Sequence, residues 1–289
     1  GKTDHRITKG VAARMHDNPE FNKRAELFMY PYDIIPGLDL YSIMFCVGII
    51  AAMVTFRLFS DRRGISARLN NFVIADGVVC VISGYASAVL FQAVYNAIET
   101  GKFEITKYTG ATFYGGFIGG AAVYFAFYFI VGHFVFGKDG EHRKNIGAVV
   151  SICAASVCIA HSFGRIGCLF AGCCYGRITT SPISVYNAYL DARVVPVQLF
   201  EALFLAALFA YLCFRIEKKQ DKCLAIYLAS YGVWRFFIEY FRTDDRGGSL
   251  VSFLTPSQLI AVVLTLVGIL LFAIETILQR RAVKEPKNV

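Results

Sequence analysis

The sequence predicts an all-α integral membrane protein with seven transmembrane helices. Hydrophobic residues make up 56% of its 289 residues and charged residues only 17%, whereas soluble domains average about 45–50% and about 25%. The apolar residues gather in runs of about 20, the length that crosses a bilayer as a helix. Lys and Arg lie in short clusters between these runs, as in the loops of membrane proteins. A disordered chain, a collagen-like chain and a disulfide scaffold are therefore excluded, and the composition disfavours an ordinary soluble enzyme.

Seven runs are long and apolar enough to be spans. In order, they are residues 40–60, 72–96, 112–136, 146–170, 197–215, 223–241 and 257–277. Short charged loops separate most of them, and the longer connections are 97–111 and 171–196. Because no internal repeat is visible, we expect one membrane domain at 39–279, between a polar N-terminal tail (1–38) and a basic C-terminal tail (280–289).

The distribution of basic residues predicts that the N-terminus lies outside and the C-terminus lies in the cytoplasm. The loops after the first, third and fifth runs carry ten Lys and Arg, and the loops on the opposite side carry six. Basic residues concentrate in cytoplasmic loops. The net charge of +8 is thus explained by loops that flank the membrane, and no nucleic-acid partner is expected.

Polar residues fall on defined faces and ends of the spans. The fourth run carries His161, Arg165 and Cys168 on one helical face, and the sixth run carries a similar series: Tyr231, Arg235, Glu239 and Arg242. The odd-numbered runs begin with further polar or small residues: Asp39, Tyr41, Ser42, Tyr114, Gly115, Gly116, Gln198, Glu201, Ser257 and Gln258. Under the predicted orientation all of these positions lie in the outer half of the bilayer, so we expect one polar cavity there.

The two arginines within the spans indicate what this cavity binds. Intramembrane charges are costly and mark functional sites unless they are paired. Glu239, one turn from Arg235, can form a structural ion pair with it. Arg165 has no acid nearby in the sequence, so we expect it to bind an external anion. Guanidinium groups suit phosphate, and at this depth the natural anion is a phospholipid headgroup.

Small residues near the spans favour structural roles. Residues 115–120 contain two overlapping G-x-x-x-G patterns, which are typical of close helix packing, although glycines can also let a substrate chain approach the backbone. Cys168, Cys173 and Cys174 form a C-x4-C-C pattern. A metal site would use them together with His161, but this spacing is not a recognised zinc pattern, so structural or disulfide roles are favoured. Neither a metal nor a cofactor is expected from this spacing.

Segment 164–177 carries a resemblance to a known family. It reads Gly-Arg-Ile-Gly-Cys-Leu-Phe-Ala-Gly-Cys-Cys-Tyr-Gly-Arg and resembles the signature of the prolipoprotein diacylglyceryl transferases, approximately G-R-x-G-N-F-x-N-x-E-x-x-G-R. Segments 40–42, 114–119, 196–201 and 231–242 resemble other motifs of that family in the same order. The resemblance implies a multi-pass enzyme of the bacterial inner membrane. Such an enzyme moves the diacylglyceryl group of phosphatidylglycerol to the lipobox cysteine thiol of a prolipoprotein, at the outer face and without a cofactor.

The resemblance also implies roles for individual residues. Arg165 and Arg235 match the two functional arginines of the family, Tyr41 matches its first-helix tyrosine and Glu239 its sixth-helix acid. We expect Arg165, Arg235 and Glu239 to be catalytic, with His161 or Tyr114 as the base. The expected substrate-binding residues are Tyr41, Gly115, Gly116, Gln198, Glu201, Arg242 and Cys168.

Several positions depart from the family pattern. Tyr114 and Val195 stand where the family has His, and Tyr85 stands where it has Arg. Cys168 replaces the signature Asn, and Cys173 occupies the acidic position. The side that binds the lipid donor therefore matches the family better than the side that binds the acceptor.

Three other classes of function remain open at this level. The first is a related transferase with the same donor but a glycan, lipid or amine acceptor, which the departures on the acceptor side favour. The second is a lipid transporter or scramblase, although the sequence lacks the inverted repeats of many transporters. The third is a sensor. A retinal protein needs a Lys that 257–277 lacks, and a thiol-redox protein would normally have a C-x-x-C motif, which is absent here.

Overall fold

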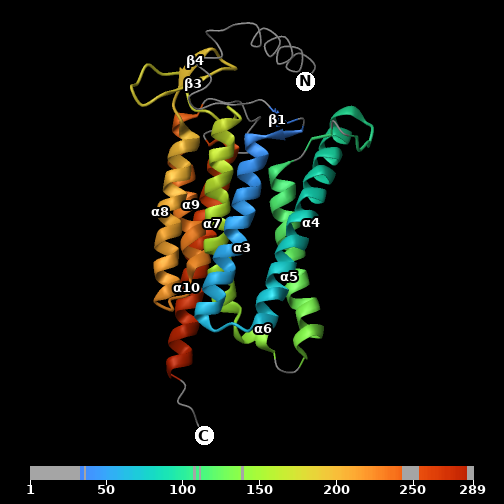
Figure 1. Cartoon of the computed structure of the whole chain (residues 1–289), viewed down its shortest axis with the longest axis vertical. Coiled ribbons are helices and arrows are strands. Elements are labelled where there is room, and N and C mark those ends of the chain that lie inside the picture. Colours follow the sequence, from blue (N-terminus) through green and yellow to red (C-terminus); the bar gives the residue numbers. More distant parts are fainter. Residues whose placement is uncertain are drawn as a thin grey trace. The chain divides into compact units, whose positions relative to one another are not determined.

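The computed structural model describes residues 33–35, 37–106, 109–110, 112–137, 140–242 and 254–284, and these are mostly helical (Figure 1). They divide into two compact units. The first unit comprises Phe56–Val149, and the second unit comprises the described parts of Gly1–Thr55 and Val150–Val289. Helices α3 (Leu40–Arg63) and α7 (Ile146–Phe170) cross the boundary between the units.

The observed helices agree closely with the predicted spans. Besides α3 and α7, the long helices are α4 (Ala67–Thr100), α5 (Phe113–Phe136), α8 (Val197–Glu217) and α10 (Pro256–Lys284). These six are long and apolar enough to cross a membrane. The sixth predicted span is α9 (Cys223–Ile238), which has 16 residues and continues into the 3-10 helix η2 (Glu239–Phe241). In the part of the chain that the structure describes, six of the seven predicted spans are therefore confirmed as long apolar helices, and the sixth span stays a prediction.

Helices α4 and α5 lie side by side in the first unit (Figure 1). A Cβ added to Gly116 would lie 3.3 Å from the Gly84 oxygen, and one added to Gly115 would lie 2.5 Å from the Cβ of Phe91. A Cβ on Gly120 would lie 3.4 Å from the Gly84 Cα. The close packing that the G-x-x-x-G patterns predict is thus confirmed, because small residues let the two backbones approach.

Glycines also set the packing of the second unit. Helices α9 and α10 run side by side. Here a Cβ on Gly268 would lie 2.5 Å from the Ala229 nitrogen, and one on Gly232 would lie 2.7 Å from the Ala261 oxygen. Helices α3 and α7 meet at Gly48, where an added Cβ would lie 3.0 Å from the Ala160 oxygen. These contacts hold polar residues of different helices at fixed relative positions.

Large apolar side chains cover much of the outside of the helices. Along α10, Leu266, Ile269 and Leu270 are 57–60% exposed. Soluble proteins rarely expose contiguous apolar patches beyond a few hundred Å², whereas lipid chains cover such surfaces in a membrane. The chain is accordingly a multi-pass membrane protein.

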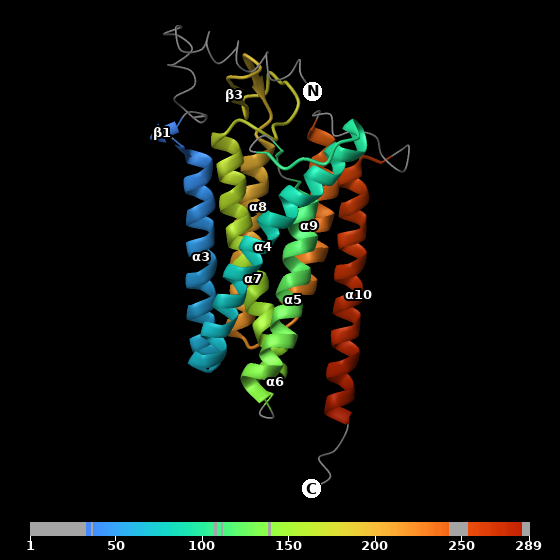
Figure 2. The ribbon, with the colours of Figure 1, turned by 90° about the vertical axis from the view of Figure 1, so that its right-hand side faces the viewer.

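The hydrophobic pattern did not predict two small hairpins, one before the first helix and one between two helices. Strands β1 (Asp33–Ile35) and β2 (Leu38–Asp39) precede α3. Strands β3 (Val185–Asn187) and β4 (Ala192–Val194) lie in the connection from α7 to α8, beyond the end of the unit where α7 stops (Figure 2).

The short helix α6 (Glu141–Lys144) connects α5 and α7. Its His142 is fully buried and contacts the rings of Phe136 and Tyr128.

Candidate active site

The polar residues of the second unit gather at one end of its helices. Helix α7 ends there and α8 begins there, with the β3–β4 hairpin between them. The end of η2 joins the same region, because Gly176 forms a β-bridge with Arg242 and the Arg177 nitrogen donates to the Phe241 oxygen at 2.7 Å. This arrangement brings the polar faces of α7, α8 and α9 together.

Arg165 on α7 is paired with an acid that its sequence neighbourhood does not contain. Its Nη2 lies 3.0 Å from Oε1 of Glu201 on α8, and their side chains are 16% and 1% exposed. Tyr231 on α9 donates a 2.7 Å hydrogen bond to the same Glu201 oxygen and accepts one of 3.3 Å from Arg165. Helix packing thus supplies, from α8, the acid that Arg165 lacks in its sequence neighbourhood.

Arg235 forms the ion pair that its spacing predicts. Its Nη2 lies 2.8 Å from Oε2 of Glu239, and it donates a 3.2 Å hydrogen bond to Ser257 at the start of α10. The other oxygen of Glu239 accepts from Thr255 at 3.2 Å, and Arg242 approaches Oε2 at 3.8 Å. Glu239 thus fixes two arginines and links α9 to the start of α10.

The two guanidinium groups share an electrostatic neighbour. The carboxylate of Glu201 interacts with both Arg165 and Arg235. Among the described residues, neither Nε of Arg165 nor Nη1 of Arg235 has a hydrogen-bond partner, although both atoms are buried. A buried donor without a partner costs about 1–3 kcal/mol. The site therefore holds two cations with unused donors, only partly neutralised by shared acids.

His161 lies one turn from Arg165 and is held by tyrosines of α9. Its Nδ1 lies 3.0 Å from the Tyr227 hydroxyl, and its ring packs against Tyr231 with centroids 4.8 Å apart. The structure thus places His161 beside the Arg165–Glu201 pair. Sequence reasoning missed Tyr227, although it stands one turn before Tyr231 on the same helical face.

Two further predicted site residues border the loop that follows α7. The ring of Tyr41 packs where α3 meets Gly167, and Tyr41 interacts electrostatically with Cys168 and Arg165. Gln198 at the start of α8 is buried and donates a 2.5 Å hydrogen bond to the backbone oxygen of Cys173. Both residues therefore lie at the same end of the unit as the arginines.

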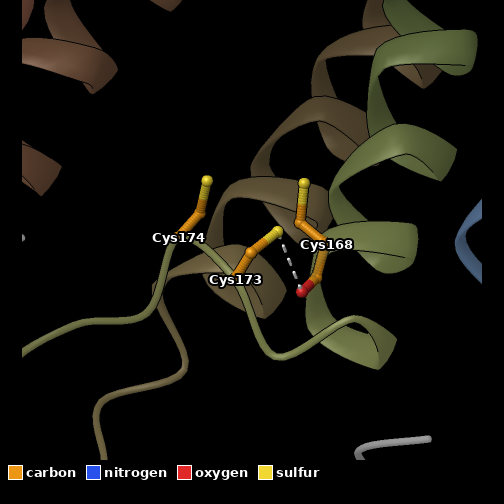
Figure 3. A group of neighbouring side chains, drawn as sticks. All are labelled: Cys168, Cys173 and Cys174. Carbon is orange, nitrogen blue, oxygen red and sulfur yellow. Dashed lines mark hydrogen bonds between the residues drawn. The ribbon is translucent and has the colours of Figure 1, made fainter. Parts of the chain in front are cut away.

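Three cysteines converge on this loop. The Sγ atoms of Cys168, Cys173 and Cys174 lie within 4.8 Å of one another, and their side chains point to one side of the loop (Figure 3). Hydrogen bonds from the Cys168 and Cys173 thiols, together with the nearby charge of Arg242, lower the pKa of the Cys174 thiol. Arg165 also interacts electrostatically with Cys168. The thiol cluster is therefore contiguous with the arginine site.

The other three predicted site residues belong to the first unit. Gly115 and Gly116 lie on α5, in the close contact with α4. Tyr114 stands at the start of the same helix, and its side chain lies outside the described part of the chain. The structure does not place these residues relative to Arg165 and Arg235.

The site thus places two buried guanidinium groups beside three thiols, at one end of apolar helices. This arrangement suits a lipid phosphate and a sulfur nucleophile. The sequence model of the prolipoprotein diacylglyceryl transferases matches residues 34–274, which include every residue of this site. The chain belongs to the prolipoprotein diacylglyceryl transferase family.

Curated members of the prolipoprotein diacylglyceryl transferase family match this chain over most of its length. The phosphatidylglycerol–prolipoprotein diacylglyceryl transferase of Clostridium tetani is 32% identical over 250 residues, which cover 83% of this chain and 94% of that protein. The second such enzyme of Clostridium perfringens is 30% identical over 261 residues, which cover 86% and 96%. That of Rickettsia bellii is 30% identical over 250 residues, which cover 81% and 90%.

Proposed function

We propose that this chain transfers the diacylglyceryl group of phosphatidylglycerol to the lipobox cysteine thiol of a prolipoprotein. The relatives from Clostridium tetani and Clostridium perfringens are named for phosphatidylglycerol and prolipoprotein. The observation that carries the proposal is the pair of buried arginines, Arg165 and Arg235, each with an unused donor and both interacting with Glu201. A lipid phosphate would complete their hydrogen bonding.

The proposal includes a topology of seven spans with the N-terminus outside, in the bacterial inner membrane. Helix α9 has 16 residues and η2 adds three. At about 1.5 Å per α-helical residue and about 2 Å per 3-10 residue, they extend about 30 Å, which matches the hydrocarbon thickness. The bias of Lys and Arg supports the orientation. The transferase domain would extend over 39–279, between tails at 1–38 and 280–289.

The donor would bind with its phosphate between α7 and α9. Arg165 and Arg235 would hold the phosphate oxygens and stabilise the charge that develops as glycerol phosphate leaves. Glu201 and Glu239 are already paired with these arginines, so they position the guanidinium groups. Tyr231, which bonds both Arg165 and Glu201, would keep the first pair aligned.

The acceptor would react as a thiolate, because a thiolate rather than a thiol is the nucleophile. Its sulfur would attack the glyceryl carbon that bears the phosphate, forming a carbon–sulfur bond as the carbon–oxygen bond breaks. His161 or Tyr114 would act as the base. The proposed substrate-binding residues are Tyr41, Gly115, Gly116, Gln198, Glu201, Arg242 and Cys168.

A transfer assay with purified protein tests the donor assignment. We would place the full chain in nanodiscs containing phosphatidylglycerol and follow lipid attachment to a synthetic lipobox peptide. Replacing Arg165 or Arg235 by Lys keeps the positive charge but removes the paired N–H donors of the guanidinium group. We therefore expect turnover to fall by about 10²–10³-fold. Arg57→Lys is the control, because Arg57 is exposed and pairs with Asp61. Full activity of both site variants would refute the assignment.

The same assay distinguishes among acceptors. A lipobox peptide with Ser in place of Cys, a glycan, a second lipid and an amine would each be offered with the same donor. Transfer to the Cys peptide alone supports the proposal. Transfer to a glycan, lipid or amine instead would identify a related transferase with another acceptor.

A further inference from the structure

The cluster formed by Cys168, Cys173 and Cys174 has the composition of a metal site. Zinc bound by protein thiolates has Zn–S distances of about 2.3 Å, which in a tetrahedron places the sulfurs about 3.8 Å apart. The three Sγ atoms already lie within 4.8 Å of one another. Small side-chain rotations would therefore complete three corners of a tetrahedron.

The backbone around the cluster is built to hold this shape. Gly172 has φ +67° and Cys174 has φ +58°, so the chain turns sharply after α7. For Cys174 this conformation is uncommon, and such strain persists only when surrounding contacts impose it. Two buried amides supply those contacts: Asn187 donates to the Gly172 oxygen at 2.9 Å and Gln198 donates to the Cys173 oxygen at 2.5 Å.

The charge around the cluster also suits a metal. Three thiolates and one Zn²⁺ carry a net charge of −1. Arg242 interacts electrostatically with Cys174, and Arg165 interacts with Cys168. These two guanidinium groups offset the remaining charge. Cys173 is exposed, so the cluster is also open to an incoming ligand.

We propose that Cys168, Cys173 and Cys174 bind one Zn²⁺ ion and leave its fourth position for the thiol of the acceptor. Catalytic zinc sites commonly have three protein ligands and one open position. Although C-x4-C-C is not a recognised zinc spacing, the left-handed turn after α7 brings the three sulfurs together. The inference rests on the proposed function for the identity of the acceptor.

Such a site would generate the nucleophile. A thiol that coordinates zinc is deprotonated outright, which meets the need for a thiolate. The zinc-bound sulfur would attack the glyceryl carbon, the carbon–oxygen bond would break, and glycerol phosphate would leave with the electron pair. The proton that the thiol releases would pass to the proposed base, His161 or Tyr114, and from there to the leaving phosphate. The thioether product carries no charge on sulfur, so it would leave the metal.

Metal analysis of the full chain in detergent, purified with reductant, gives the first test. We expect about one zinc per chain, as the three-ligand site requires. We expect Cys168→Ser and Cys173→Ser to lower zinc affinity by more than about 100-fold, since even changes outside the ligand shell cost about 10- to 100-fold. Cys46→Ser, at an exposed cysteine of α3, should retain the metal. An unaffected zinc content in both cluster variants, or a Cys168–Cys173 disulfide trapped in cells, would overturn the proposal.

Cobalt substitution tests the open position without relying on turnover. Co²⁺ in place of zinc should show thiolate-to-metal charge transfer and tetrahedral absorption bands. Adding the lipobox peptide should shift these bands, whereas the same peptide with Ser in place of Cys should not. A spectrum that does not respond to the Cys peptide would overturn the proposal.

The transfer assay separates this inference from the proposed function. We expect chelation to abolish transfer to the Cys peptide and added zinc to restore it. Full transfer by metal-free protein would refute the zinc site and leave the proposed function intact. A cobalt spectrum that responds to the peptide, without transfer under any condition, would support the metal site and refute the proposed function.

Discussion

Glu201 on α8 accepts a hydrogen bond from Tyr231 on α9 through the same oxygen that contacts Arg165 on α7. One carboxylate thus joins three helices at the centre of the site. The side chain is only 1% exposed. The desolvation cost of its negative charge is therefore offset by these partners. Glu201 therefore positions Arg165, in addition to the substrate-binding role proposed for it.

Replacing Glu201 by Gln should destabilise the protein and disable the site together. Breaking a buried ion pair by removing one partner costs about 3–5 kcal/mol, because the remaining charge is left uncompensated. We expect a lower free energy of unfolding in detergent and a loss of lipid transfer. Glu104→Gln is the control, since Glu104 is exposed. An unchanged unfolding free energy in Glu201→Gln would show that the ion pair contributes nothing.

Replacing Glu239 by Gln should affect activity through Arg235 and Arg242. The Glu239 carboxylate contacts Arg235 at 2.8 Å and Arg242 at 3.8 Å, and it accepts a hydrogen bond from Thr255. Gln keeps the shape and one acceptor oxygen but removes the charge. If Glu239 only positions the arginines, Glu239→Gln should raise KM for phosphatidylglycerol more than it lowers kcat. The steady-state kinetics of the purified variant measure this split, and a kcat loss with unchanged KM would contradict it.

Local sequence signals predicted the helices and one of the two ion pairs. Runs of about 20 apolar residues are enough to locate a span, and the i, i+4 spacing is enough to pair Arg235 with Glu239. Glu201 could not be matched to Arg165 in this way, because the two lie on different helices and only tertiary packing brings them together. The convergence of Cys168 with Cys173 and Cys174 depends on a left-handed turn, for which the hydrophobic pattern gives no signal.

The buried His142 should make stability depend on pH. Burial, and then the charge of Arg143, lower its pKa from 6.5. Below about pH 6.5 the unfolded chain therefore binds more protons than the folded chain, so the free energy of unfolding falls as the pH drops. We expect His142→Leu to reduce this dependence, as measured by unfolding at about pH 7.5 and about pH 5.5.

A neighbouring histidine gives the matched control for this pH dependence. His133 lies close to Arg143, with its Nδ1 3.3 Å from the Arg143 Nη2. The ring nitrogens of His142, by contrast, have no hydrogen-bond partner among the described residues. His133→Gln should retain the loss of stability at low pH. If His142→Leu and the unaltered protein lost the same stability on acidification, buried His142 would not be the cause.

The contact between α9 and α10 should be essential for the arginine site, although no reacting group lies in it. An added Cβ on Gly268 would lie 2.5 Å from the Ala229 nitrogen and 2.8 Å from the Ala225 oxygen. These are backbone atoms, so Gly268→Ala can be accommodated only if the helices separate. Overpacking of this kind costs about 1–3 kcal/mol. Because Arg235 on α9 bonds Ser257 on α10, the separation should also lower activity.

Gly77→Ala on α4 is the control, because an added Cβ there meets nothing within 4 Å. That change should leave transfer intact and stabilise the helix by about 0.5–1 kcal/mol, since Ala loses less backbone entropy than Gly. Unfolding free energies and transfer rates of the two variants make the comparison. If Gly268→Ala behaved like Gly77→Ala, the close approach of α9 and α10 would not be what aligns Arg235 with the start of α10.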